Sequence, residues 1–174
     1  MTSDVSASVT TRAAKRVPWA MFDQNAVREL YDDYAAFLDD GDYASWLELF
    51  DESAVYTVTA RENVERGLPL ATIRCDSRDM LADRIDALVT TQFYARRITR
   101  HVVTAIRPVG IDNGHLHTSA NFVLIETIED ESTRIQSAGT YDDVIAMFDG
   151  ELRFVEKRAI YDAPLVPTSI IVPL

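Results

Sequence analysis

Residues 22–40 carry hydrophobic and polar positions in the rhythm of an α-helix. Apolar side chains recur at three- and four-residue steps, which places them on one face of a helix with 3.6 residues per turn. These positions are Ala26, Leu30, Tyr34, Phe37 and Leu38. Asp23 or Asn25 can cap the first turn, and Gly41 favours a left-handed end. The pattern therefore predicts a first helix over 22–40 with one buried face.

The next stretch, GDYASWLELFDESAVYTV at residues 41–58, changes from helical to strand periodicity. Asp42 is a candidate cap for a second, short helix with one apolar side. That side consists of Tyr43, Trp46, Leu47 and Phe50. Alternation over Ser53–Ala60 predicts a strand, and Leu68–Cys75 predicts its partner after a polar connector at 61–67. This stretch either lids a pocket or forms the wall of a domain, and aromatic residues at helical spacing favour core.

One further helix, over 78–90, and four long strands are predicted next. The strands are 99–111, 115–128, 133–147 and 151–161. Asn113-Gly114 and Asp149-Gly150 are strong signals for tight hairpin turns. A strand of thirteen residues spans roughly 43 Å at 3.3 Å per residue and does not stay flat. Gly110 and Gly139 are therefore predicted as bulge or bend points.

Helices first and an antiparallel meander afterwards predict an α+β domain. We expect a cone, in which the curled sheet wraps the first helix and leaves a cavity between them. The chain has 174 residues, of which 47% are hydrophobic. That size suits a single domain with its own core. We predict this domain over residues 21–174, after a flexible arm at residues 1–20.

The acidic charge balance argues against some classes of binding partner. The formal net charge is −11, and a field of that sign repels nucleic acid and anionic membrane surfaces. No apolar run approaches the roughly 20 residues of a membrane helix. Cys75, the single cysteine, excludes an internal disulfide and a thiolate-rich metal site. It fits a reducing compartment, and we expect a cytoplasmic protein without nucleic-acid or membrane partners.

Three side chains are candidates for acid–base chemistry inside the cone: Asp33, Tyr56 and His101. A carboxylate held in an apolar pocket can act as a general base, and such a group would suit a dehydratase or an isomerase. The alternative places Asp33 on a solvated helix face and His101 in a half-buried, hydrogen-bonded position. A third possibility is a binding module that holds a small apolar ligand in the cone without turnover.

Other chemistry finds little support in the sequence. His115 and His117 share one face of a strand, but a metal site needs further ligands and none stands in an obvious position. We therefore predict no metal site in this chain. The sequence contains no serine elbow, no phosphate-binding loop and no dinucleotide glycine motif. These absences argue against the common nucleophilic and nucleotide-binding enzyme classes.

A small basic island stands out in this acidic chain: Tyr94, Arg96, Arg97 and Arg100. Arginine pairs readily with carboxylates inside a protein, and it is also favoured where a planar guanidinium meets a carboxylate across an interface. The island is therefore either a set of internal ion pairs or a surface that docks a partner protein.

Several segments, taken in order, resemble the small subunits of aromatic-ring-hydroxylating dioxygenases. The first is DYASWLELFDESAVYTV at 42–58. The terephthalate- and salicylate-type members are similar also in ENVERGL at 62–68, DSRDMLADRIDAL at 76–88 and YARRITRH at 94–101. The resemblance runs from about residue 26 to the C-terminus and leaves out the first 20 residues.

The resemblance implies the cystatin-like cone fold of nuclear transport factor two, ketosteroid isomerase and scytalone dehydratase. It implies a large partner subunit that carries a Rieske [2Fe-2S] cluster and a mononuclear iron, in an assembly of three large and three small subunits. A reductase would supply the electrons, and an aromatic acid would be hydroxylated. The small subunit would be structural, so no catalytic residue carries over. A Rieske cluster needs two Cys and two His as ligands. This chain has a single cysteine, Cys75, which is consistent with cofactors that belong to the partner.

Overall fold

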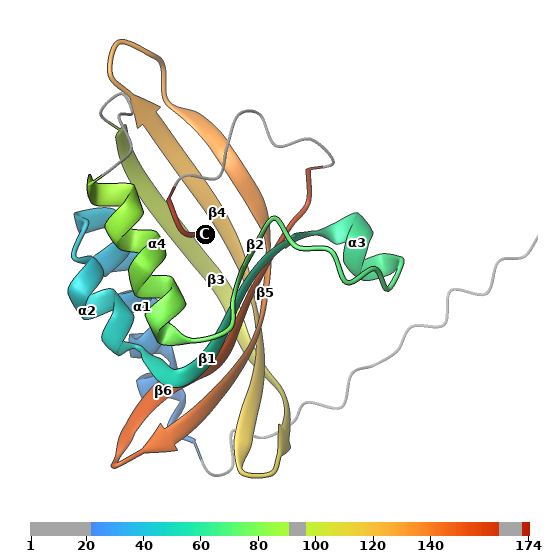
Figure 1. The fold of residues 1–174 in the computed structure, drawn as a ribbon. Coiled ribbons are helices and arrows are strands. Elements are labelled where there is room, and N and C mark those ends of the chain that lie inside the picture. Colours follow the sequence, from blue (N-terminus) through green and yellow to red (C-terminus); the bar gives the residue numbers. More distant parts are fainter. Residues whose placement is uncertain (1–21, 91–96, 164–171) are drawn as a thin grey trace, which may run out of the picture.

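A six-stranded, strongly curved sheet wraps around the first helix (Figure 1). The computed structural model describes residues 22–90, 97–163 and 172–174. The elements, in chain order, are α1 Gln24–Asp40, α2 Tyr43–Glu48, β1 Phe50–Ala60, α3 Arg61–Glu65, β2 Ile73–Cys75, α4 Arg78–Thr90, β3 Arg97–Asp112, β4 His115–Ile128, β5 Arg134–Phe148 and β6 Glu151–Tyr161. The predicted α+β cone is confirmed. The predicted arm at residues 1–20 lies outside the described residues.

The long strands form the predicted meander. The sheet order is β2-β1-β6-β5-β4-β3, and β3 to β6 pair antiparallel in sequence. The hairpins turn at Asn113-Gly114 and Asp149-Gly150, with positive φ at all four residues, as tight primed turns require. β1 adds to this meander by pairing in parallel with β6, and β2 pairs antiparallel with β1. The sheet is therefore mixed, whereas the sequence predicted a purely antiparallel one.

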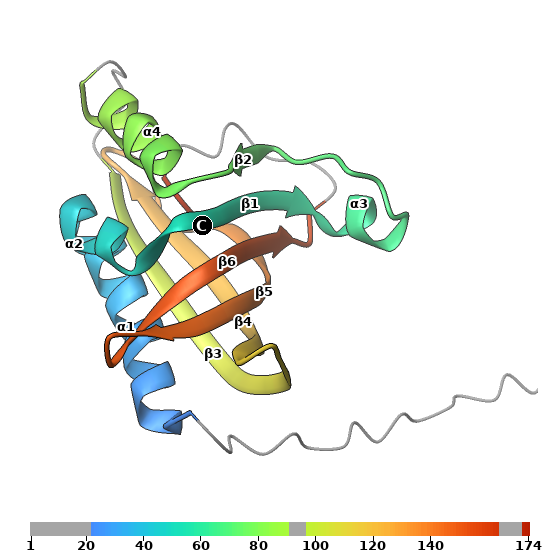
Figure 2. The same cartoon turned by 60° about the horizontal axis from the view of Figure 1, so that its bottom comes forward.

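The largest local differences lie between β1 and α4. The connector over 61–67 contains the short helix α3, and the predicted strand Leu68–Cys75 shrinks to Ile73–Cys75. Leu68 and Leu70 are 43% and 58% exposed in the loop that precedes it. Pro69, between them, has no N–H for a strand ladder. This loop runs alongside β1 on the side where β2 pairs, as Figure 2 shows.

The two glycines predicted as bends behave differently. Gly110 stands at a register shift between β3 and β4, so it marks a bulge. Gly139 stays in register with both neighbouring strands. A Cβ added at Gly139 would overlap the backbone oxygen of Ile160, so glycine is required there by the close approach of β6 rather than by a bend.

Aromatic side chains fill the space between α1 and the concave side of the sheet. Trp46 and Phe50 are fully buried, with ring centroids 4.8 Å apart. Tyr34 of α1 lies 5.8 Å from Trp46 and 5.7 Å from Phe154 of β6, measured between ring centroids. The prediction that Trp46 and Phe50 belong to the core is confirmed. Residues 41–58 thus form a wall of the cone, with Trp46 and Phe50 packed into its aromatic core.

Candidate functional site

The polar centre of the cone is built from α1, β1 and β3. His101 of β3 is 7% exposed. Its Nδ1 lies 2.7 Å from Oδ1 of Asp39, and its backbone N–H donates to both oxygens of that carboxylate at 3.0 Å. On its other side, Nε2 lies 3.1 Å from the carbonyl oxygen of Pro173. Both ring nitrogens face acceptors, so the ring donates both hydrogen bonds only in its doubly protonated form.

Two tyrosine hydroxyls complete this centre. Tyr34 donates to the backbone oxygen of Leu174 at 2.5 Å, and Tyr56 donates to the same oxygen at 3.2 Å. The Tyr56 hydroxyl also accepts from the Leu174 N–H at 2.9 Å. Burial raises the pKa of both hydroxyls above the ordinary tyrosine value. Both therefore remain protonated donors at neutral pH.

The structure brings together only part of the predicted acid–base group. Tyr56 and His101 converge on the backbone of Pro173 and Leu174. Asp33 does not join them, because it is exposed on the outer side of α1. The carboxylate that reaches His101 is Asp39. The sequence offered only a weak signal for Asp39, which follows directly after Leu38 of the predicted buried face.

A second polar group lies buried between α1 and the sheet, and the sequence did not predict it. Lys157 of β6 and Asp143 of β5 have no exposed side-chain surface, and Lys157 Nζ lies 3.0 Å from Asp143 Oδ2. The same oxygen accepts from the Tyr31 hydroxyl at 2.5 Å, and Oδ1 accepts from the backbone N–H of Arg158 at 3.0 Å. The ammonium stands 2.9 Å from the ring centroid of Tyr141. This geometry gives the carboxylate three donors and the cation an aromatic face.

Burial dominates the electrostatics of this pair. Desolvation lowers the pKa of Lys157 to about 8, although the attraction of Asp143 opposes the shift. Desolvation also raises the pKa of Asp143, against the stabilising effect of Lys157 and Tyr31. Each shift has the sign expected when water is removed from a charged group. Neither side chain of the pair reaches solvent, so we assign the pair a structural role in the core.

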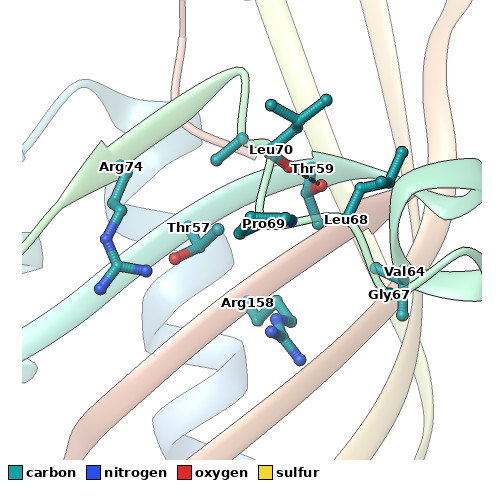
Figure 3. A pocket seen from close by; sticks show the side chains of 10 residues that line it. Thr57, Thr59, Val64, Gly67, Leu68, Pro69, Leu70, Arg74 and Arg158 are labelled. Atoms are coloured by element: carbon teal, nitrogen blue, oxygen red, sulfur yellow. Dashed lines mark hydrogen bonds between the residues drawn. The ribbon is translucent and has the colours of Figure 1, made fainter.

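An open pocket of about 410 Å³ lies on the outer face of the sheet, under the loop that precedes β2 (Figure 3). Arg74, Thr57 and Arg158 stand side by side on β2, β1 and β6, and Leu68 and Leu70 contribute an apolar wall. Arg74 pairs with Asp76 at 2.7 Å, and Arg158 lies 3.8 Å from Asp142. Each guanidinium thus has a carboxylate of its own chain nearby, which reduces the charge that the pocket offers to a ligand.

The basic island divides in the structure. Arg97 forms an ion pair with the buried Glu126 at 2.6 Å, and Arg134 pairs with the other oxygen of Glu126 at 3.0 Å. Arg100 is exposed on the outer face of β3 and donates to the backbone oxygen of Thr99. Tyr94 and Arg96 lie outside the described residues. Arg97 therefore has the internal role that was one of the two alternatives, and Arg100 presents its side chain to solvent.

The predicted histidine pair lies on the same outer surface. His115 and His117 are half-buried on β4. Within residues 22–90, 97–163 and 172–174, no group of three or more His, Cys, Asp or Glu side chains is placed to hold a metal ion. None of the helices in these ranges combines the length and the apolar composition of a membrane-spanning helix.

Comparison with known proteins identifies the family. Residues 34–168 match the sequence profile of the family described as "Ring hydroxylating beta subunit". The anthranilate 1,2-dioxygenase small subunit of Burkholderia cepacia is 30% identical over 141 residues, which cover 81% of this chain and 88% of that protein. The terephthalate 1,2-dioxygenase terminal oxygenase component subunit beta 2 of a Comamonas species is also 30% identical, over 81% of this chain and 92% of its own length.

A solved structure supports the same assignment. The beta subunit of a proposed aromatic-ring-hydroxylating dioxygenase from Novosphingobium aromaticivorans superposes with a TM-score of 0.78 at 34% identity, over 87% of this chain and 96% of that one. Fold, sequence profile and curated relatives agree over most of the chain. The chain therefore belongs to the beta, or small, subunits of the ring-hydroxylating dioxygenases.

Proposed function

We propose that this chain is the structural, non-catalytic small subunit of a Rieske non-haem iron oxygenase that hydroxylates an aromatic acid. The observation that carries the proposal lies inside the cone. Tyr56 and His101, the two groups that reached the centre, hydrogen-bond to the backbone of the chain's own residues 173 and 174. A hydroxyl and an imidazole engaged in this way hold the chain's own backbone in place, which supports a structural role for both.

The remaining parts of the proposal concern the assembly. The resemblance of the sequence implies three large and three small subunits, with the [2Fe-2S] cluster and the mononuclear iron in the large subunit and electrons from a reductase. The relatives named for anthranilate and terephthalate support an aromatic acid as substrate, because both names denote aromatic acids. Cys75 is free and buried, which fits the reducing cytoplasm in which we place this complex.

We place the docking of the large subunit on the outer face around Arg100. Ile98 and Val102 flank Arg100 on β3 and are 51% and 42% exposed. Arg100 pairs in register with Ile125 of β4, and Ile125 pairs with Ile135 of β5, which is 67% exposed. An arginine among exposed aliphatic side chains resembles the composition of interface centres, where charges are few and arginine is enriched. The predicted docking residues Tyr94 and Arg96 precede this patch in the sequence.

Co-expression tests the proposal directly. The chain is produced together with the large subunit encoded beside it, recognised by its Cys-x-His and Cys-x-x-His ligand pairs, and the purified complex is analysed by native mass spectrometry and iron determination. We expect equal numbers of the two chains and iron only where the large chain is present. A free small chain that dehydrates or isomerises a substrate by itself, and loses this activity with His101→Ala, would replace the proposal by the stand-alone enzyme.

A pair of charge reversals tests the docking surface. Arg100→Glu should weaken association with the large subunit at least tenfold, because a carboxylate would then face the acidic group that the guanidinium meets. Arg74→Glu, on the outer face of β2, is the matched control and should leave association unchanged. Equal effects of both substitutions, or no effect of Arg100→Glu, would contradict this placement of the interface.

A further inference from the structure

Residues 173 and 174 lie in the cone as a bound ligand lies in its site. Leu174 has no exposed surface, and it belongs to the same buried cluster as Trp46 and Tyr56. Pro173 is also buried. Side chains of other elements hydrogen-bond to three backbone atoms of these two residues: the N–H of Leu174 donates, and the oxygens of Leu174 and Pro173 accept. The described part of the chain's last segment is thus held by specific polar contacts as well as by apolar burial.

The groups that hold this segment come from three separate elements. Tyr34 belongs to α1, Tyr56 to β1 and His101 to β3. Tyr34 and Tyr56 are 118 or more residues away from Leu174 in sequence, so their positions are set by the fold of the cone and not by the local path of the segment. The Asp39 carboxylate contacts Nδ1 of His101 and so orients the ring with Nε2 toward residue 173. Such a set of pre-oriented donors, surrounded by aromatic rings, has the composition of a small-ligand site.

The hydrogen-bond pattern is selective for one arrangement of atoms. The Leu174 oxygen receives two phenol donors, while its N–H donates to one of the same two hydroxyls. Tyr56 therefore contacts the donor and the acceptor of a single residue. His101 Nε2 contacts the preceding carbonyl oxygen. An occupant must present two oxygen acceptors, one N–H donor and an apolar group of about the size of a leucine side chain.

We propose that the interior of the cone is a binding site for a short apolar peptidyl or acyl-amino-acid group, and that Val172–Leu174 occupies it in cis. Without an occupant, Tyr34, Tyr56 and His101 would be buried polar groups without these partners, which is unfavourable in an apolar interior. The segment therefore both completes the core and competes with any free molecule that carries the same atoms. This inference does not depend on the partner subunit or on the reaction of the complex.

Amide hydrogen exchange in the full-length chain provides the first test. We expect the Leu174 amide to exchange at least about 100-fold more slowly than the amide of the same residue in free acetyl-Val-Pro-Leu, because its N–H is buried and bonded. Tyr56→Phe removes the acceptor and should speed this exchange about tenfold or more. Tyr161→Phe is the matched control: its hydroxyl pairs with Thr72 on the other side of β1, so it should leave the Leu174 exchange rate nearly unchanged. Exchange at the free-peptide rate in the unmodified chain would overturn the proposal.

Binding in trans provides the second test, and it also uses the full-length chain. Leu174→Gly keeps the backbone but removes the side chain that anchors the segment, so the site should accept acetyl-Val-Pro-Leu added as the acid or the amide. We expect saturable binding at least tenfold tighter than to the unmodified chain, measured by calorimetry or by shifts of the Tyr56 ring signals. The double variant Tyr56→Phe/Leu174→Gly should lose this gain. A folded Leu174→Gly chain that binds neither form of the peptide would refute the binding site, whatever the result of the subunit co-purification.

Discussion

Replacing Lys157 by methionine removes the cation from the most deeply buried ion pair of the described chain. Neither Lys157 nor Asp143 exposes any side-chain surface. Methionine has a similar length and places a polarisable sulfur near the ring of Tyr141, which the ammonium now faces at 2.9 Å, so shape and part of the aromatic contact are kept. The substitution therefore isolates the loss of charge. The Asp143 carboxylate keeps the Tyr31 hydroxyl and the Arg158 N–H as donors and loses its counter-charge.

The expected loss follows from two opposing terms. Removing one partner of a buried ion pair typically lowers the free energy of unfolding by about 3–5 kcal/mol, because the other charge stays buried without compensation. That range refers to whole variants, so it already includes the relief gained when the ammonium is no longer buried. Burial already raises the pKa of Asp143, and this carboxylate can take up a proton to relieve its own charge. We therefore expect a net loss of about 2–4 kcal/mol at pH 7.

A double variant separates the ion pair from simple damage to the core. Asp143→Asn retains an acceptor oxygen for the Arg158 N–H and removes the negative charge. In Asp143→Asn/Lys157→Met we expect stability to recover by about 2 kcal/mol relative to Lys157→Met alone, since two uncharged side chains replace two charged ones. Equilibrium unfolding in urea, followed by tryptophan fluorescence, measures all three proteins. A loss below about 1 kcal/mol in Lys157→Met, or a double variant no more stable than Lys157→Met, would refute this account of the pair.

Three further predictions concern stability. Gly139→Ala should lower the free energy of unfolding by about 3 kcal/mol or more, because the new Cβ would lie 2.9 Å from the carbonyl carbon of Ile160 and closer still to its oxygen. A Cβ at Gly110 meets nothing within 4 Å, so Gly110→Ala, the control, should cost less than about 1 kcal/mol in urea unfolding. Trp46→Ala should cost about 3–5 kcal/mol as a large-to-small core change, and a loss well under 1 kcal/mol would contradict its full burial. Between pH 7.5 and 9.5 the free energy of unfolding of the unmodified chain should rise by roughly 2 kcal/mol relative to Lys157→Met. The reason is that the folded lysine, with its pKa of about 8, releases its proton in this range while the unfolded lysine still binds one. Parallel pH curves for the two proteins would show that the Lys157 pKa is not lowered.

Periodicity and turn chemistry predicted most of the architecture. The helical repeat through Leu30 and Leu38 located α1, and Asn113-Gly114 and Asp149-Gly150 located both hairpins, because these signals are local in sequence. The parallel pairing of β1 with β6 was not predicted, since no local pattern records which distant strand a sheet edge meets.

The candidate site was predicted less completely for a related reason. Tyr56 and His101 were predicted to face the interior of the cone, and both are buried there. Asp33 was the predicted carboxylate, but Asp39 is the one that reaches His101. Both flank the apolar stripe of α1, and the helical repeat alone does not show which of them the curled sheet approaches. The contact of His101 with Pro173 joins residues 72 positions apart, and no spacing rule applies to such a pair.

The pairing of β1 with β6 has a consequence for the order in which the molecule is made. Tyr56 of β1 lies in register with Lys157 of β6, so the aromatic wall around Trp46 stays incomplete until about 100 further residues have left the ribosome. At a synthesis rate of about 5–20 residues per second, that delay lasts roughly 5–20 s. During this time β1 presents an unpaired edge and an apolar face, both of which favour association between nascent chains. Cotranslational folding should therefore end in a single late step, and the yield of soluble chain should respond to chaperone supply more than the stability of the finished fold would indicate.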